Sequence, residues 1–170
     1  MDAVIMIGAP GSGKSTIVES LYSDYKVLSR DIIRSDMGLC KPGEKFKGDA
    51  EQEKAVHNEW LSRLNDLIKK DFQFIIDDTN CVHKYLVEEL NMIKTLAARY
   101  HKTINSIEVV RVITPVEVLI KNRPQIPAKD LQRMFQSAVS LNLEKIVKVK
   151  PIFPDAKITN IHTKYWKENR

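Results

Sequence analysis

The amino-acid sequence predicts an α/β fold in which a parallel sheet is flanked by helices. The chain has 170 residues, which is close to the commonest size of a single domain. Apolar residues make up 43% of it and charged residues 29%, the balance of an ordinary globular protein. Strand-like and helix-like segments alternate along the chain, as is typical of a parallel sheet with helices on both faces. We therefore expect a single domain over residues 1–170.

The expected elements follow from the spacing of apolar residues. Residues 3–7 form a continuous apolar run, as expected for a buried parallel strand. Residues 14–23 are typical of a helix that places Ile17, Val18 and Leu21 on one face. In chain order, the sequence then predicts a strand at 26–28, helical turns at 30–36, a helix at 50–69, a strand at 72–76, a helix at 83–100, a strand at 106–113, helices at 115–122 and 127–144, and a short strand near Ile158.

Two long helices carry the clearest core faces. Trp60 falls on the inward stripe of the first, so we interpret it as a core residue. The residues expected to point inward are Val56, Trp60, Leu64, Leu67 and Ile68 on the helix at 50–69, and Leu86, Leu90, Ile93 and Ala97 on the helix at 83–100.

Charge and cysteine content restrict the class of protein further. No apolar run is long enough to span a membrane, and no signal peptide precedes the first strand. Cys40 and Cys81 match neither a disulfide framework nor a metal-binding spacing, so we expect a reduced cytoplasmic compartment, the host cytoplasm if the protein is viral. Residues 1–100 hold 14 basic and 16 acidic side chains, and residues 101–170 hold 13 and 6. The basic second half, with its tail from Lys145, suits a polyanionic partner or a solvated lysine-rich surface.

The segment from Gly8 to Thr16 reads G-A-P-G-S-G-K-S-T and matches the phosphate-binding loop G-x-x-x-x-G-K-[ST]. It follows an apolar strand and opens a helix, which is the context that the motif requires. The glycines let several backbone N–H groups point inward and form an anion nest at the helix N-terminus. Lys14 would then reach the β- and γ-phosphates of ATP, and Ser15 would ligate Mg²⁺. The residues expected to bind the nucleotide, in a fold of the P-loop NTPase type, are Gly8, Pro10, Gly11, Ser12, Gly13, Lys14, Ser15 and Thr16.

This loop alone leaves several classes of nucleotide-using protein open. GTPase switches, ATPase motors and small kinases all contain it. The chain lacks the guanine-reading sequence N-K-x-D, and it is too short for a motor module with its usual insertions. A kinase is the class that remains, so the chain should also supply a site for the phosphate acceptor.

A first candidate acceptor segment follows the strand predicted at 26–28, at the sheet edge where ligands bind. Asp31 and Arg34 are three residues apart, so they share one face of a helical turn. They offer a carboxylate that accepts a hydroxyl proton beside a guanidinium that holds a phosphate. The same spacing also fits a helix cap with an ion pair.

A second candidate segment, Asp77, Asp78, Thr79 and Asn80, ends the strand predicted at 72–76. Two carboxylates at this position are suited to bind Mg²⁺ or to fix the phosphate loop, and to contact the acceptor. The alternative is a turn that caps the next helix. The functional interpretation is favoured because this strand end and the phosphate loop face the same crevice.

The motifs G-x-P-G-S-G-K-S-T, R-D-x-x-R, D-T-N and a basic segment before [IV]-P together resemble the 5′-hydroxyl polynucleotide kinase domain of bacteriophage end-healing enzymes. Those enzymes are similar to a wider set of P-loop kinases that includes the zeta toxins. The order and spacing of the motifs match over about residues 1–140. The resemblance implies Mg²⁺-dependent transfer of the ATP γ-phosphate to the 5′-OH end of DNA or RNA, in nucleic acid repair.

The resemblance also implies a role for each matching residue. Lys14 and Ser15 match the pair that binds ATP and Mg²⁺. Asp31 matches the general base that deprotonates the 5′-OH, and Arg34 matches the residue that clasps the phosphate next to the acceptor nucleoside.

Further correspondences concern the acceptor and the lid. Asp78, with Thr79 and Asn80, matches the D-T-N element that orders the acceptor site. Ile126 stands at the apolar position before the lid proline, where the family packs against the acceptor base.

The lid, a small helical segment at about residues 119–130, departs from the family pattern. Two arginines usually precede its [IV]-P, whereas this chain has the shorter segment K-N-R-P-Q-I-P with one. Arg123 is therefore the predicted lid cation, which binds ATP and stabilises the transferring phosphoryl group. Lys121 is the alternative, although its ammonium group lacks the fork of a guanidinium.

A second departure is the lack of the phosphatase signature D-x-D-G-T, so the expected enzyme is a kinase without a partner 3′-phosphatase. Two alternatives stay open. One is a P-loop kinase of a small molecule such as a nucleoside or a sugar derivative. The other is a zeta-toxin-like effector or a non-catalytic, nucleotide-dependent binding module.

Overall fold

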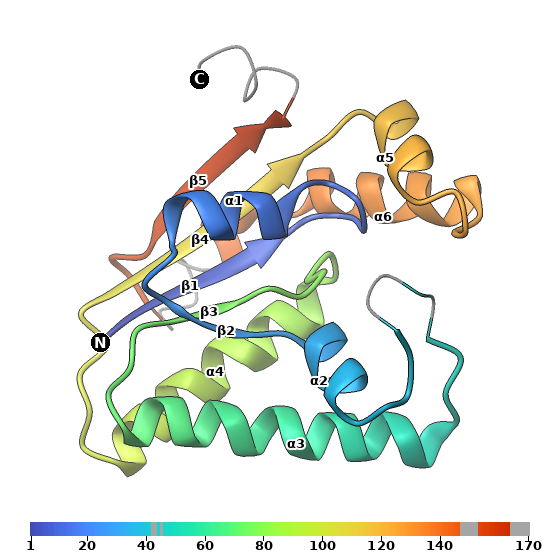
Figure 1. Ribbon diagram of the computed structural model, residues 1–170. Helices are drawn as coiled ribbons and strands as arrows, with labels where there is room; N and C mark the ends of the chain where they lie inside the picture. Colours follow the sequence, from blue (N-terminus) through green and yellow to red (C-terminus); the bar gives the residue numbers. More distant parts are fainter. Residues whose placement is uncertain (42–43, 45, 147–152, 164–170) are drawn as a thin grey trace.

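Within the part of the chain that the structure describes, five parallel strands form one sheet in the order β2-β3-β1-β4-β5 (Figure 1). The structure is a computed structural model and describes residues 1–41, 44, 46–146 and 153–163. The strands are Asp2–Ile7 (β1), Lys26–Leu28 (β2), Phe74–Ile76 (β3), Ser106–Ile113 (β4) and Lys157–His162 (β5). The helices are Lys14–Leu21 (α1), Arg30–Asp36 (α2), Ala50–Lys69 (α3), His83–Arg99 (α4), Val116–Asn122 (α5) and Ala128–Ser140 (α6). The predicted α/β fold of the P-loop NTPase type is confirmed, including the short strand near Ile158.

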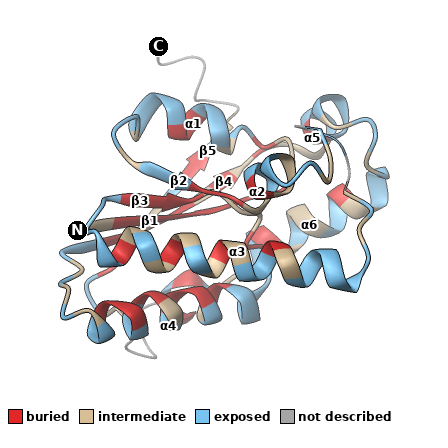
Figure 2. Cartoon of the chain, turned by 60° about the horizontal axis from the view of Figure 1, so that its bottom comes forward, coloured by how far each residue is buried: buried red, intermediate tan, exposed pale blue. Residues whose placement is uncertain are grey.

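The central strand β1 is buried on both of its faces, which explains its continuous apolar sequence. Successive side chains of a strand point to opposite faces of the sheet. Accordingly, Ile5 and Ile7 pack in the cluster that includes the inner residues of α3 and α4. Val4 and Met6 pack in a second cluster with residues of α1. The sheet is thus covered by α1 on one side and by α3 and α4 on the other (Figures 1 and 2).

The two long helices bury the faces that the sequence predicts. Figure 2 shows their buried residues in a stripe that faces the sheet. Leu67 is only partly buried, at the edge of this stripe. The fully or almost fully buried members are Val56, Trp60, Leu64 and Ile68 on α3, and Leu86, Leu90, Ile93 and Ala97 on α4.

The inward position predicted for Leu21 and the strand start predicted at residue 72 are both wrong. Leu21 is 52% exposed because α1 ends there, and Tyr22 packs against the cluster under α1 instead. Phe72 is 43% exposed and lies outside β3. The chain turns sharply before it, where Asp71 has a φ of 61°, so the strand begins only at Phe74.

The last predicted helix, 127–144, is also shorter than expected, because α6 ends at Ser140. Arg111 of β4 stabilises this end. Its Nη1 donates to the carbonyl oxygens of Ala138, Val139 and Leu141 at 3.2, 3.2 and 3.0 Å. Its Nε donates to Oδ1 of Asn160 on β5 at 2.6 Å. A guanidinium therefore satisfies carbonyls that the end of the helix leaves without partners.

Two further observations concern the whole chain. No helix among the described residues combines the length and the apolarity needed to cross a membrane. Most of the basic tail after Lys145 lies at residues 147–152 and 164–170, outside the described residues.

The contrast between two helical leucines gives a stability test. Leu64→Ala empties space in the core and should lower the free energy of unfolding by about 2–5 kcal/mol. Leu21→Ala, the matched control, should lower it by less than about 0.5 kcal/mol because the side chain is mainly in water. Urea unfolding of both variants measures the difference. Equal losses would contradict the burial of Leu64 and the exposure of Leu21.

Candidate active site

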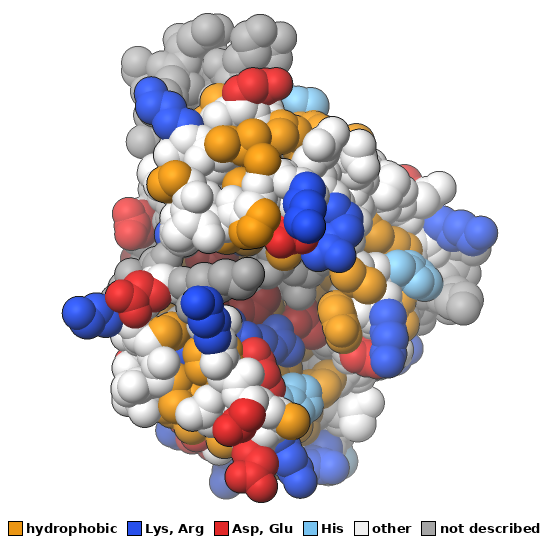
Figure 3. Space-filling view, turned by 90° about the vertical axis from the view of Figure 1, so that its right-hand side faces the viewer, with side chains coloured by type: hydrophobic (Ala, Val, Ile, Leu, Met, Phe, Trp, Pro, Cys, Tyr) orange, Lys and Arg blue, Asp and Glu red, His pale blue; other side chains and the backbone are white. Residues whose placement is uncertain are grey.

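The P-loop connects β1 to α1 at the edge of the sheet where the parallel strands end (Figure 1). Gly11 and Gly13 have φ values of 81° and 89°, the left-handed region that glycine adopts without strain. The N–H of Gly8 donates to the carbonyl oxygen of Thr79 at 3.0 Å, so the loop is joined to the segment after β3. Figure 3 views this side of the molecule, where charged side chains of both signs gather around a hollow.

Lys14 is held inside the loop. Its Nζ donates to the carbonyl oxygens of Gly8 and Ala9 at 2.9 and 3.3 Å. Burial lowers the pKa of Lys14, and the carboxylates of Asp77 and Asp31 are among the groups that oppose this shift. The lysine therefore lies within electrostatic range of carboxylates from both predicted acceptor segments.

Ser15 and Asp77 form a pair that suits a divalent cation. The Ser15 hydroxyl donates to Oδ2 of Asp77 at 2.9 Å, while Oδ1 of Asp77 is buried without a hydrogen-bond partner. Hydroxyl and carboxylate oxygens are the hard ligands that Mg²⁺ prefers, and Mg²⁺ is commonly held by one or two protein groups together with phosphates. The residues thus fit Mg²⁺, and no cluster of three or more potential metal ligands occurs among the described residues.

In the first predicted acceptor segment, Asp31 and Arg34 lie together on α2. Arg34 Nη1 is 2.8 Å from Oδ1 of Asp31, and Nη2 is 3.2 Å from Oε2 of Glu53 on α3. The Phe46 ring centroid is 5.0 Å from the guanidinium. The Asp31 side chain is 88% exposed. Ser29, not Asp31, caps the helix, because its hydroxyl accepts from the Asp31 N–H at 3.3 Å.

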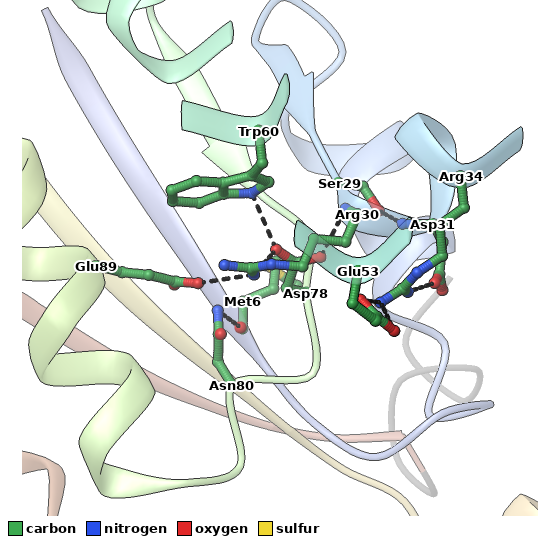
Figure 4. Close-up of polar contacts among 10 residues, drawn as sticks. All are labelled: Met6, Ser29, Arg30, Asp31, Arg34, Glu53, Trp60, Asp78, Asn80 and Glu89. Atoms are coloured by element: carbon green, nitrogen blue, oxygen red, sulfur yellow. Dashed lines mark hydrogen bonds and ion pairs between the residues drawn. The ribbon is translucent and has the colours of Figure 1, made fainter. Parts of the chain in front are cut away.

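Asp78 lies beneath this surface pair and is engaged by α2 and α3 (Figure 4). Its Oδ1 accepts from the backbone N–H of Arg30 at 2.8 Å, and its Oδ2 accepts from Trp60 Nε1 at 3.1 Å and from the Arg30 guanidinium. The guanidinium also lies 4.5 Å from the Trp60 ring centroid and 3.1 Å from Oε1 of Glu89. Arg30 thereby connects α2, α3, α4 and the end of β3.

This network contains residues that sequence reasoning missed. Trp60 is a core residue as predicted, but its indole N–H also holds a site carboxylate. Neither Arg30 nor Glu89 is among the predicted site residues, although the charge of Arg30 next to Asp31 and the glutamate on an inward helix face are signals in the sequence. Sequence separation hid their contact, since Glu89 stands 59 residues after Arg30.

Thr79, Asn80 and Cys81 form the turn beside the P-loop. The Asn80 amide donates to the carbonyl oxygen of Met6 on β1 at 3.2 Å, and the Cys81 thiol donates to that of Thr79 at 3.1 Å. Burial raises the pKa of Cys81 to about 11, so the thiol stays protonated. The polar groups of the D-T-N segment thus bond to other parts of the protein and fix the turn in place.

The lid segment lies against the P-loop. The Asn122 amide donates to the carbonyl oxygen of Gly11 at 2.9 Å. A Cβ on Gly11 would come within 2.8 Å of Cγ of Arg123, so the arginine stem covers this glycine. Ile126 is partly buried against Leu119 and its neighbours, and Lys121 is exposed. Arg123, one of the two candidate cations, therefore lies against the P-loop.

A protein-family profile described as an AAA domain matches residues 4–137. The chain belongs to this AAA-domain family. The match runs from β1 into α6 and covers every site residue described so far. No curated protein matches the AAA-domain chain in sequence.

Solved structures share the fold of this AAA-domain protein. A candidate kinase from Chloroflexus aurantiacus superposes with a TM-score of 0.60 at 16% identity, over 98% of this chain and 87% of the other. A chain of the Pnkp1/Rnl/Hen1 RNA repair complex gives 0.60 at 21% identity, over 81% of this chain and 44% of its own length. A sugar kinase from Janibacter sp. gives 0.55 at 17% identity, over 96% and 86%. The AAA-domain protein thus has the P-loop kinase fold and spans less than half of the matched chain in the repair complex.

Glu89 gives the site a proton that titrates near neutral pH. Burial raises the pKa of Glu89 to about 8, and the nearby Asp78 carboxylate adds to the rise. Asp78 accepts hydrogen bonds from two residues, whereas Oε2 of Glu89 is buried without a partner. The single positive charge of Arg30 cannot balance both carboxylates, so the proton resides on Glu89 at neutral pH.

Glu89→Gln should remove a pH-dependent loss of stability. Between about pH 4.5 and pH 8 the unfolded carboxyl is ionised while the folded one keeps its proton, so the free energy of unfolding of the wild type falls as pH rises. The variant lacks this titration, and its stability relative to wild type should grow by on the order of 3 kcal/mol from pH 5 to pH 8. Urea unfolding across this pH range measures the trend.

Glu88→Gln is the matched control, since Glu88 is half-exposed on the same helix. It should show no such growth. A Glu89→Gln advantage that stayed constant with pH would contradict a protonated Glu89.

Proposed function

We propose that this protein is an ATP-dependent phosphotransferase that moves the γ-phosphate of ATP to the 5′-OH end of DNA or RNA. One observation carries the proposal. The Asp31 carboxylate is exposed, paired at 2.8 Å with Arg34, and within electrostatic range of Lys14 in the P-loop. A proton acceptor, an anion-binding group and a phosphate-binding lysine therefore share one site. The proposed unit is a single domain, with its lid at about residues 119–130.

In the proposed reaction, Asp31 accepts the proton of the acceptor hydroxyl as that oxygen bonds to the γ-phosphorus and the bond to the departing ADP breaks. Arg34 holds the phosphate next to the acceptor nucleoside. Lys14 exchanges its bonds to the loop carbonyls for phosphate oxygens, and Arg123 adds positive charge from the lid. Mg²⁺, held by Ser15 and Asp77, would neutralise charge on the β- and γ-phosphates.

The other predicted acceptor-side residues take supporting roles in this scheme. Asp78 holds the backbone of Arg30, directly before Asp31, and so positions the base. Thr79 and Asn80 fix the turn beside the P-loop. Ile126 offers a partly exposed apolar surface at the lid, where a nucleobase could pack.

The charge distribution supports a nucleic acid rather than a small acceptor. The lid and the chain after it are basic, and Lys121 and Lys129 on the lid are exposed. Cations placed beside a phosphate site favour a strand that carries several phosphates. The likeness in fold to a chain of an RNA repair complex supports the same class of substrate.

A second candidate is a P-loop kinase of a sugar or nucleoside. Arg34 already lies within 3.2 Å of carboxylate oxygens of both Asp31 and Glu53, so the three groups together carry a net charge of −1. Such a cluster also suits an uncharged acceptor with several hydroxyls, whose protons would bond to the carboxylates.

The experiment that separates these candidates measures transfer of labelled phosphate from ATP to three kinds of acceptor. The acceptors are 5′-OH oligonucleotides of DNA and RNA, free nucleosides, and simple sugars. Transfer to the oligonucleotides above the other two supports the proposal. Transfer to sugars or nucleosides alone would replace it with the second candidate.

Asp31→Asn should abolish transfer while ATP binding is preserved. The amide keeps the shape of the carboxylate but cannot take up the proton, so kcat should fall by on the order of 10²-fold or more. Asp36→Asn, an exposed residue of the same helix that pairs with Arg63, is the matched control and should keep full activity. Near-normal turnover of Asp31→Asn would leave the residue only its ion pair with Arg34.

Arg34 should determine the preference for a phosphorylated acceptor. The wild type is expected to use a nucleoside 3′-monophosphate better than the free nucleoside. Arg34→Ala should erase most of this preference, on the order of 10- to 100-fold in kcat/KM, because a charge-assisted contact to phosphate is lost. Arg63→Ala serves as the control. Equal use of both acceptors by the wild type would argue for the small-molecule kinase.

A further inference from the structure

Two threonine hydroxyls form a chain from the end of β5 to the P-loop. Thr114, buried directly after β4, donates from its hydroxyl to the carbonyl oxygen of Ser12 at 2.8 Å. The hydroxyl oxygens of Thr114 and Thr163 are 2.7 Å apart, and Thr163 directly follows β5. The two ends of neighbouring strands are thereby connected to the loop through side chains.

The direction of the second hydrogen bond follows from counting protons. A hydroxyl has one hydrogen, and a carbonyl oxygen can only accept. The hydrogen of Thr114 is used on Ser12, so the hydrogen between the two threonines belongs to Thr163. Thr163 therefore donates to Thr114, and Thr114 donates to Ser12. Each hydroxyl strengthens the next as a donor, because hydrogen bonds in a chain polarise one another.

The bond to Ser12 fixes a peptide plane inside the phosphate loop. In a planar trans peptide the C=O and the following N–H point in opposite directions. The hydrogen bond from Thr114 to the Ser12 carbonyl oxygen therefore directs the Gly13 N–H away from Thr114. Gly13, which follows this plane, has a left-handed φ of 89° and offers little resistance to its rotation. Thr114 is thus a side-chain restraint on this carbonyl.

We infer that Thr114 and Thr163 are positioning residues for the donor nucleotide, which aim the Gly13 N–H at its phosphates through the Ser12 carbonyl. This inference rests on the proposed use of ATP. Backbone N–H groups of such loops bind phosphate in the bound substrate as well as in the transition state. Loss of the hydroxyls should therefore weaken nucleotide binding and leave kcat at saturating ATP nearly unchanged.

The test measures equilibrium binding of ATP and of inorganic tripolyphosphate to the full chain. Thr114→Val removes the donor and leaves a buried carbonyl without a partner, so both dissociation constants should rise about tenfold. Thr114→Ser keeps the hydroxyl and should restore binding. Thr159→Val is the matched control, because this β5 hydroxyl donates to Glu108 on β4 at 2.6 Å instead of to the loop. It should bind both ligands like the wild type.

Thr163→Val tests the direction of the hydrogen bonds from Thr163 through Thr114 to Ser12. Its effect should be smaller, about threefold, and equal for ATP and tripolyphosphate, because Thr163 acts only through Thr114. The double variant should bind no worse than Thr114→Val alone, since the second hydroxyl then has nothing to strengthen. Should Thr114→Val fail to fold, Thr163→Val and Thr114→Ser still decide the matter.

Four results would overturn the inference. If Thr163→Val binds both ligands like the wild type, Thr163 does not act on the loop through Thr114. Fully additive losses, or a Thr163→Val effect on ATP and not on tripolyphosphate, would mean that Thr163 acts on the nucleotide by itself. A fall in kcat with unchanged binding would move the role of Thr114 to the chemical step. A wild type that binds no nucleotide would instead refute the proposed function, and the inference with it.

Discussion

The carboxylate of Asp78 holds α2, with Asp31 and Arg34, to the end of the sheet. A buried carboxylate is stable only where donors surround it, and Asp78 receives a backbone N–H and a guanidinium from Arg30 and an indole N–H from Trp60. These donors come from α2 and α3, while Asp78 itself follows β3. The position of Asp31 depends on this arrangement, because Asp31 directly follows the residue whose backbone Asp78 holds. Removing one partner would leave a buried charge unpaired, which is far more destabilising than losing a surface ion pair.

The charge asymmetry of the sequence has a spatial meaning in the fold. The carboxylates near the P-loop lysine, Asp31, Asp77 and Asp78, all come from the acidic first 100 residues. The lid and its cations come from the basic remainder. The carboxylates lie within electrostatic range of Lys14 and the lid arginine covers Gly11, so both groups border the P-loop. Phosphate bound between them would meet positive charge from the lid and from Lys14, while the carboxylates are left for protons and for a cation.

Elements determined by local pattern could be predicted from the sequence, and contacts between distant segments could not. The strand at β2 and the helix at α3 have the predicted bounds, because apolar spacing and flanking polar residues define them locally. The P-loop and the pairing of Asp31 with Arg34 follow from short motifs for the same reason. By contrast, the exposure of Leu21 depends on where a neighbouring tyrosine packs. The contacts of Arg30 with Glu89, and of Thr114 with Thr163, join residues 59 and 49 positions apart and leave no periodic signal.

The guanidinium of Arg111 has a mechanical consequence for the lid. It donates hydrogen bonds to three carbonyls at the C-terminal end of α6 and to one side chain of β5, so this end of the helix is fixed to the sheet. The other end of α6 carries the loop with Arg123 and Ile126. A helix of this length spans about 20 Å at the usual rise per residue. If the end of α6 near Arg111 stays fixed, a tilt of about 10° moves the end at Ala128 by roughly 3 Å, which is about the length of one hydrogen bond. In the proposed kinase, such a tilt would move Arg123 and Ile126 relative to the P-loop while the core beneath α6 stays intact.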